Sequence, residues 1–391
     1  MLLLIIGLIL FVGLVVIHEF GHFIMARRNG VEIEEFGIGF PPKVWKKRIK
    51  SPKGDYDFTI NLLPLGGFVR LKGENDAASA KGTFGAASLW AKTQIMAAGV
   101  VMNLITALVL LTILAVIGLP RLIENQFTVP SDTKITPATV AVATVEDGSP
   151  ADRAGLREGD VIRAIGPAGN QTALEAPRDL RGLTSRYAGQ QVQVRYERGG
   201  QTRQATVDLR DEQEVAASLK TNNPKGYLGV SPDPASIATQ RSTWSAPIVA
   251  LGLTGQLTKL TFEGLGRAVA GLGSLIAGAA TGNSEARSNG QRQASEQVSG
   301  PLGIFFILKE GGVLGYQFML FIIAVISLTL AIMNILPIPA LDGGRLWLTL
   351  LTHGIGKPLS KEKEELINGI GFLFLMVLIV LITIVDIKRF F

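Results

Sequence analysis

The chain has 391 residues, of which 47% are hydrophobic, a balance that suits a membrane protein carrying a soluble insert. The formal net charge is +6, yet no basic stripe with interleaved aromatic residues is present, so the charge does not indicate nucleic-acid binding. The chain contains no cysteine, which excludes disulfides and thiolate metal ligands.

Four apolar segments are expected to cross a membrane as helices, and we assign them to residues 1–26, 95–120, 316–344 and 366–387. Basic residues gather after the first segment and between the third and the fourth, which places these loops in the cytoplasm and both chain ends outside. A secretory signal peptide is the alternative for the first segment. Because that segment lacks a basic start and a small-residue cleavage site, we expect it to be retained.

The first apolar segment contains two of the three histidines of the chain, four residues apart. On a helix this spacing places His18 and His22 on one face, one turn apart, where both imidazoles can bind one metal ion. Glu19 can then act as a general base toward water at that metal. Ionisable groups cost about 2.5–3.5 kcal/mol each in the middle of a membrane helix, so the pattern indicates a functional site.

Residues 27–94 are expected to form a cytoplasmic loop and a membrane-associated β-hairpin. Residues 31–53 contain a Gly-Ile-Gly-Phe-Pro-Pro turn and are interpreted as loop. Polar and apolar residues alternate over 55–62 and again over 68–72, which is typical of strands. The hairpin is placed beside the mouth of the metal site, and an ordinary soluble hairpin is the alternative.

The second apolar segment contains a small and a polar residue one turn apart, Gly99 and Asn103. We expect this face to pack against the first segment, because small residues allow membrane helices to approach closely.

Residues 121–245 are charged, β-branched and rich in turns, which predicts an extracytoplasmic soluble domain. The segment 147–162 has the pattern of a turn, a short helix, a glycine exit and a strand, and further strands are expected at 191–197 and 204–209. This pattern resembles a PDZ domain with a core at about 138–212, and such domains bind extended peptides by strand addition. A spacer without a ligand is the alternative.

Residues 246–315 are expected to form an amphipathic surface helix and a linker. Lys259, Glu263 and Arg267 are spaced four apart and so share one helical face, which favours a helix on the outer membrane surface over a fifth span. Residues 281–299 are rich in Gly, Ser and Gln and are expected to be flexible.

A third metal ligand is expected from the end of the third span. Two prolines, Pro337 and Pro339, break that helix, and Asp342 follows them directly, with glycines that permit an unusual turn. Because the third span runs in the same direction as the first, Asp342 arrives at a depth similar to that of the two histidines. A His₂-carboxylate set would leave one position open for water.

Two alternatives stay open for this third ligand. Asp342 could belong to a plain Asp-Gly turn that ends the helix. His353 is the other free candidate, but it follows in the polar cytoplasmic loop expected at 345–365, where we expect its ring to be solvated.

Together these motifs resemble the site-2 protease family of intramembrane zinc metalloproteases, in its bacterial regulator-of-sigma-E-protease form. They run in the family's order over essentially the whole chain and comprise His18–His22, Pro64–Val69, Gly99 with Asn103, the PDZ-like segment, Ser299–Ile304 and Asn334–Gly343. The sequence departs from the family at Val100, where a proline is common, and in having one PDZ-like domain where some members have two.

The resemblance implies a polytopic α-helical protein of the bacterial inner (cytoplasmic) membrane, with four transmembrane helices, a membrane-associated β-hairpin and an inserted, extracytoplasmic α+β PDZ domain. The implied activity is zinc-dependent endoproteolysis within the transmembrane segment of a single-span membrane protein, often an anti-sigma factor that another protease has already cut during stress signalling. The partners would be this substrate and membrane lipids, with no nucleic acid.

The resemblance also implies residue roles. Zn²⁺ would be held by His18, His22 and Asp342, with Glu19 as the catalytic base. The hairpin residues Gly66, Gly67 and Phe68 would hold the unwound substrate as an added strand, and Asn334 would also contact it.

Two other classes of function compete with a protease. A membrane-anchored PDZ scaffold would use zinc structurally, but structural zinc sites usually have four protein ligands and only three candidates are visible. A zinc transporter would need more ionisable groups along its spans than this sequence contains.

Overall fold

The computed structural model describes residues 2–74, 78–174, 177–219, 224–233, 236–283, 285, 301–356 and 360–390. The chain divides into two compact units, and each is described by itself. Unit 1 comprises Met1–Ile113, Pro247–Gly312 and Met319–Phe391, and unit 2 comprises Leu114–Ala246 and Val313–Phe318.

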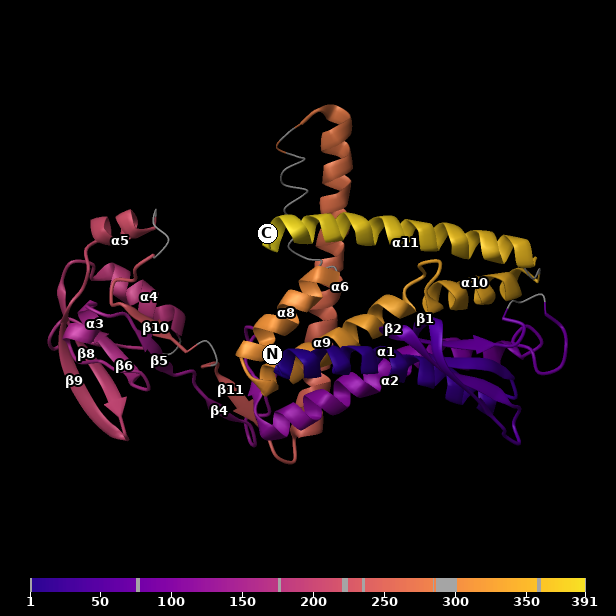
Figure 1. Cartoon of the computed structure of the whole chain (residues 1–391), viewed down its shortest axis with the longest axis horizontal. Helices are drawn as coiled ribbons and strands as arrows, with labels where there is room; N and C mark the ends of the chain where they lie inside the picture. The colour runs from indigo at the N-terminus through magenta and orange to yellow at the C-terminus, as the bar shows by residue number, and fades with distance from the viewer. Residues whose placement is uncertain are drawn as a thin grey trace. The chain divides into compact units, whose positions relative to one another are not determined.

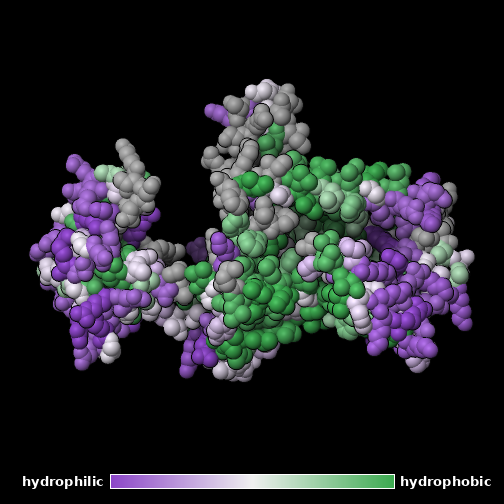
Figure 2. All heavy atoms as spheres, viewed as in Figure 1, coloured by the Kyte–Doolittle hydropathy of each residue, from purple (hydrophilic) through white to green (hydrophobic). Residues whose placement is uncertain are grey.

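Long helices dominate unit 1 (Figure 1). Among the described residues, four helices are long and apolar enough to cross a membrane: α1 (Leu2–Arg28), α2 (Leu89–Ile117), α9 (Tyr316–Ile335) and α11 (Lys361–Phe390). Hydrophobic side chains cover the helical surface in Figure 2, as expected for helices that face lipid. These helices overlap the four expected segments, but α2 and α11 begin earlier and α9 ends before the two prolines.

Within the described part of the chain, three further helices lie almost entirely in unit 1, namely α6 (Ala246–Thr281), α8 (Pro301–Val313) and α10 (Asp342–Ile355). α6 is one continuous helix that contains the three charges of the expected amphipathic segment, and its location on a membrane surface stays a prediction. Most of the linker expected at 281–299 lies outside the described residues.

α10 corrects the loop expected at 345–365. Leu346 and Thr349 are buried, whereas Trp347 and Leu351 on the opposite face are exposed, so the segment forms an amphipathic helix. Its two glycines lie inside its first turn rather than in a loop. A Cβ added at Gly343 would lie 2.4 Å from the Ile335 carbonyl carbon, so glycine lets α10 begin directly against the end of α9.

A sheet of two long strands packs on α1. β1 (Ile33–Ile49) pairs antiparallel with β2 (Tyr56–Leu71), so the interpretation of residues 31–53 as a loop was wrong. Shifts in register place the first half of β1 between two parts of β2, since Phe36 lies opposite both Phe58 and Val69. The Phe36 ring is buried, with its centroid 5.3 Å from that of Phe23 on α1. This packing outweighs the glycines and prolines that disfavour a strand locally.

Unit 2 contains a six-stranded sheet in the order β10-β5-β6-β8-β9, with β7 paired to β6. In chain order, the strands of this sheet and the helices between them are β5 (Val140–Val145), α3 (Pro150–Arg153), β6 (Val161–Gly166), β7 (Thr172–Ala173), α4 (Pro177–Arg186), β8 (Gln191–Arg198), β9 (Gln201–Asp208), α5 (Glu212–Ser218) and β10 (Val230–Pro232). The expected turn, short helix, glycine exit and strand are present, because Ser149 caps α3 and Gly155 follows with a φ of +76°. The assignment of this unit as a PDZ domain stays a prediction.

A small sheet of β3 (Leu119–Pro120), β11 (Thr239–Arg241) and β4 (Lys134–Thr136) joins the two chain ends of unit 2. β3 follows α2 directly and β11 lies just before α6, so the entry and exit of the inserted unit are neighbours. Asp132 accepts hydrogen bonds from Ser245 and Thr243 at the start of α6, and these bonds hold the pKa of the Asp132 carboxyl well below its usual value.

Candidate metal centre

Three side chains from the two ends of the chain meet in unit 1. His18 and His22 project from α1, and Asp342 projects from the first turn of α10. Asp342 Oδ2 lies 2.9 Å from His18 Nε2 and 3.2 Å from His22 Nε2, and the two Nε2 atoms are 3.3 Å apart. Both histidines are buried. The other candidate, His353, is exposed in the last turn of α10 and lies outside this group.

Two glycines set the approach of α1 and α2 at the level of the histidines. A Cβ added at Gly99 would lie 2.5 Å from both His18 Cε1 and His22 Nε2, so a larger residue would displace the rings or fill the space between them. A Cβ added at Gly21 would lie 2.6 Å from the carbonyl oxygen of Ala98 on α2. The expected packing of the Gly99 face against the first span is therefore confirmed.

The second nitrogen of His22 is fixed by the backbone of α2. His22 Nδ1 lies 2.7 Å from the carbonyl oxygen of Ile95, so Nδ1 carries the ring proton and donates a hydrogen bond to this oxygen. The lone pair of Nε2 then points toward Asp342 and is available to a metal.

Asn103 lies against the second nitrogen of His18. Its Nδ2 is 3.3 Å from His18 Nδ1, and its Oδ1 is buried without a hydrogen-bond partner among the described residues. A half-turn of the amide, which exchanges its oxygen and nitrogen, would let Oδ1 accept a hydrogen bond from His18 Nδ1–H and so give this oxygen a partner. Two neutral imidazoles with anchored Nδ1–H groups and one carboxylate form a donor set that fits zinc.

Glu19 lies beside these three residues without belonging to the group. Its Oε2 accepts a hydrogen bond from the backbone N–H of Val69 on β2 at 3.1 Å. Glu19, His22 and Asp342 line one cavity of about 220 Å³, together with Phe68, Val69 and Leu71 of β2. The carboxylate therefore faces the same space as the candidate metal-binding atoms, where it could accept a proton from water.

The hairpin residues that the sequence singled out lie where β2 passes over α1. Gly66 has a φ of +148°, which favours glycine, and a Cβ added at Gly67 would lie 3.6 Å from Glu19 Cγ. Phe68 lines the cavity. Asn334 is half-buried in the last turn of α9, and its amide makes no hydrogen bond to any described residue.

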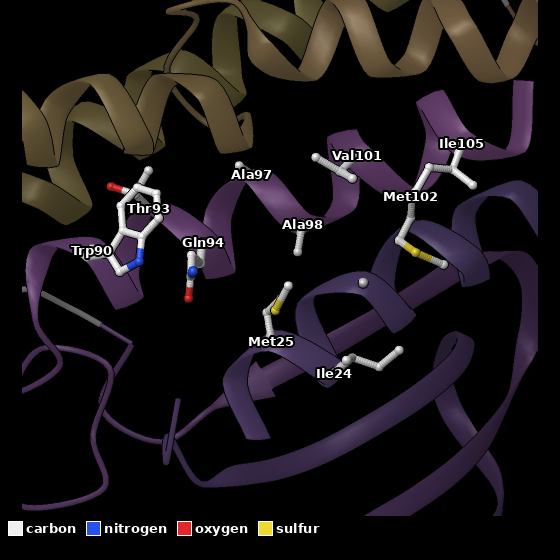
Figure 3. Close-up of a pocket in the computed structure, with 11 residues that line it drawn as sticks. Ile24, Met25, Trp90, Thr93, Gln94, Ala97, Ala98, Val101, Met102 and Ile105 are labelled. Atoms are coloured by element: carbon white, nitrogen blue, oxygen red, sulfur yellow. The ribbon is translucent and has the colours of Figure 1, made fainter. Parts of the chain in front are cut away.

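A larger cavity of about 380 Å³ lies between α1 and α2 (Figure 3). Met25 of α1 and Ala98 of α2 point toward one another across it. Its lining is mostly apolar and includes no titratable side chain. Among the lining residues of this larger cavity, none can act as an acid, a base or a charged metal ligand.

Sequence reasoning missed two polar residues of the smaller cavity, Arg345 and Glu74. Arg345 follows Asp342 by three residues, so its presence on the same helical face could have been predicted if α10 had been recognised. Glu74 follows β2 in a stretch that gave no sequence signal for the site.

Residues 6–378 match the family model described as peptidase family M50. The chain belongs to peptidase family M50. Similar proteins include the zinc metalloprotease RasP of Shouchella clausii, 26% identical over 98% of both chains, and the regulator of sigma-W protease RasP of Bacillus subtilis, 27% identical over 98% of both chains. The zinc metalloprotease RasP of Geobacillus kaustophilus is 27% identical over 98% of this chain and 97% of its own.

This M50 member is a zinc metallopeptidase, so the expected family, activity and cofactor are confirmed. The scaffold and transporter alternatives are not supported. Four apolar helices and membership of this family agree with a membrane protein, and the sheet-rich unit 2 fits a PDZ-like domain.

Proposed function

We propose that this M50 peptidase cleaves single-span membrane proteins within their transmembrane segment. The observation that carries this proposal is the position of the His18, His22 and Asp342 cluster. Two of its members lie inside α1, a helix long and apolar enough to cross a membrane, and Gly99 of a second such helix packs directly on them. A substrate bond that reaches these residues must itself lie at membrane depth.

The substrate class that we propose is an anti-sigma-factor-like protein that has already received a first cut. One similar protein is named regulator of sigma-W protease, which supports this class. The reaction would then be the second cut of a stress-signalling cascade.

In the proposed reaction His18, His22 and Asp342 would hold Zn²⁺, which when bound would polarise the scissile carbonyl and lower the pKa of the attacking water. Glu19 accepts the proton of this water and passes it to the leaving amide nitrogen. The Val69 N–H group holds one oxygen of Glu19 and so orients the carboxylate toward the cavity.

A helical substrate must unwind before hydrolysis, because its carbonyl groups are occupied in hydrogen bonds. We infer that the unwound segment pairs with the edge of β2 that faces the cavity. Phe68, Val69 and Leu71 on this edge line the cavity, which supports strand addition beside Glu19. Gly66 and Gly67 would leave room for the added chain, and the Asn334 amide would donate to one of its carbonyls.

We further infer that unit 2 is an extracytoplasmic PDZ domain and that the protein resides in a bacterial inner membrane. β10 ends the sheet of unit 2, and a terminal strand offers an edge to an extended peptide. The orientation is supported by Arg27 and Arg28, which end α1 on the side that the positive-inside rule assigns to the cytoplasm.

The experiment that tests the proposed function is the Glu19→Gln variant, co-expressed with a single-span substrate that has been truncated outside. We expect this fragment to accumulate uncut in the membrane, while the purified variant keeps near-stoichiometric zinc because Glu19 is not a ligand. Loss of zinc from this variant would refute the division of roles. If the wild-type protein instead cuts the substrate in a soluble loop, the membrane location of the scissile bond is refuted.

A further inference from the structure

The cavity beside the metal-binding residues contains a guanidinium that the proposed reaction does not use. Arg345 follows Asp342 by three residues on α10, so both side chains project from the same helical face, about one turn apart. Both line the cavity of about 220 Å³, together with Val69 and Leu71 of β2.

Arg345 connects α10 to the end of β2. Its NH1 group donates to Glu74 Oε1 at 2.9 Å, and its NH2 group donates to the backbone carbonyl oxygen of the same residue. Glu74 lies three residues beyond Leu71, the last residue of β2. One planar guanidinium thus holds both the side chain and the main chain of Glu74, which the single ammonium of a lysine does not reproduce.

The surroundings of Arg345 distinguish this contact from an ordinary surface ion pair. Its guanidinium carbon lies 4.7 Å from the ring centroid of Phe84, which is 1% exposed, and its Nε lies 3.6 Å from Glu364 Oε1 on α11. Lys92 Nζ lies 5.7 Å from the centroid of the same ring. The Arg345 side chain is 20% exposed, whereas that of Glu74 is 42% exposed, so solvent screens the charge pair and its main effect is on geometry.

We propose that Arg345 is a positioning residue that keeps the substrate-binding edge of β2 at a fixed distance from Asp342. This inference rests on the proposed function, in which that edge holds the unwound substrate. β2 is linked to α1 through Val69 and Glu19, and Arg345 links the end of the same strand to the helix that carries Asp342. Through these two links, the distance between the bound scissile bond and the third ligand, Asp342, would stay fixed.

Other contacts also hold the end of β2 in place. Lys72 directly follows β2 and makes two backbone hydrogen bonds. Its N–H group donates to the carbonyl oxygen of Glu32 at 2.9 Å, and its carbonyl oxygen accepts from the N–H group of Phe84 at 2.9 Å. Phe84 and Leu346 belong to one buried apolar cluster, which remains when the guanidinium is removed. Variants at Arg345 are therefore expected to fold and to keep zinc.

The first test compares variants in the full-length protein, reconstituted with a single-span substrate. Arg345→Ala is expected to lower kcat about 10–100-fold with KM and zinc content nearly unchanged, because a small misplacement of the reacting groups has an effect of this size. Arg345→Lys should fall between this variant and the wild type. Arg48→Ala is the matched control, since it breaks a 3.1 Å pair with Asp57 in the same sheet without touching the cavity, and it should leave kcat unchanged. Wild-type kcat in Arg345→Ala, or loss of its zinc, would overturn the positioning role.

The second test separates positioning from gating. Because the chain contains no cysteine, Glu74→Cys combined with Arg345→Cys introduces two unique thiols. Bridging them with a short bis-maleimide should restore much of the lost rate if the separation must be held. If the contact instead has to open to admit the substrate, the bridged enzyme will be slower than the unbridged one, and the positioning role is wrong.

A third measurement needs no substrate, so it distinguishes failure of this inference from failure of the proposed function. Hydrogen exchange of the amides in Phe68–Lys72 should be faster in full-length Arg345→Ala than in Arg48→Ala. If the wild-type protein cleaves no membrane substrate but this difference appears, the link stands and the proposed function falls. Equal exchange in both variants shows that Arg345 does not hold the strand.

Discussion

At the scale of single residues, we expect the absence of a side chain at Gly99 to be as important for zinc binding as the three proposed ligands. Gly99→Ala would place a Cβ 2.5 Å from an atom of each imidazole, so we expect the purified variant to contain far less zinc and to lose proteolysis. Gly13→Ala on α1 is the control, because an added Cβ meets no atom within 4 Å there. Full zinc occupancy in Gly99→Ala would mean that α1 and α2 can separate without disturbing the site.

The choice of the third ligand is tested by two substitutions within α10. Asp342→Asn keeps the shape of the side chain but removes its negative charge, which leaves a much poorer zinc ligand. We expect this variant to insert and fold, with lowered zinc content and no cleavage, whereas His353→Ala should match the wild type in both. Metal analysis of the purified proteins decides the matter, and the reverse result would assign the role to His353.

At the scale of elements, a buried ion pair holds the strands of unit 2 together. Asp160 is fully buried at the start of β6, where Arg198 Nε donates to it at 2.6 Å and Arg157 N at 2.8 Å. Burial raises the pKa of the Asp160 carboxyl, but the hydrogen bonds from Arg198 and Arg157 outweigh it, so the pKa is lowered overall.

A carboxyl with a lowered folded-state pKa stabilises the fold above its unfolded pKa of about 4, and this contribution is lost as the pH falls through the folded value. Asp160→Asn should therefore lower the free energy of unfolding of unit 2 by about 2 kcal/mol at pH 7. It should also reduce the further loss of stability on acidification. Hydrogen exchange of residues 138–174 in the full-length protein, at pH 7 and at acid pH, measures both effects. An unchanged exchange rate at pH 7 would contradict the role of this pair.

The elements that sequence could predict are those with a strong local signal. Long apolar runs predicted the four spanning helices, and the spacing of His18 and His22 predicted a shared helical face. β1 was missed because its glycines and prolines indicate a loop, and only pairing with β2 makes it a strand. α10 was missed because Gly343 suggests a turn, although it serves close packing against Ile335. The contact between Arg345 and Glu74 spans 271 residues, and no local pattern predicts it.

At the scale of the whole molecule, the proposed chemistry is confined to one unit. Glu19 and the three proposed ligands all belong to unit 1. Deleting residues 138–209 from unit 2 should therefore leave zinc binding and cleavage intact, with less discrimination between full-length and trimmed substrates. A folded, zinc-loaded deletion variant without activity would show that unit 2 takes part in the reaction.

The orientation in the membrane gives a separate prediction. Reporters fused at Lys46 in β1 should read cytoplasmic, and reporters fused at Gly189 in unit 2 should read external, because basic residues collect after α1. Paired alkaline phosphatase and fluorescent protein fusions measure this. A cytoplasmic signal at Gly189 would overturn the arrangement.

The origin of the proposed ligands at opposite ends of the chain has a consequence during biosynthesis. His22 and Asp342 are separated by 320 residues, and at about 5–20 residues per second a ribosome needs roughly 16–64 s to travel between them. During that interval the nascent chain already contains Glu19 but lacks Asp342, the proposed third ligand. Because the proposed ligand set is incomplete until then, we expect a chain whose translation stops before α10 to be inactive and helices inserted nearby to stay uncut.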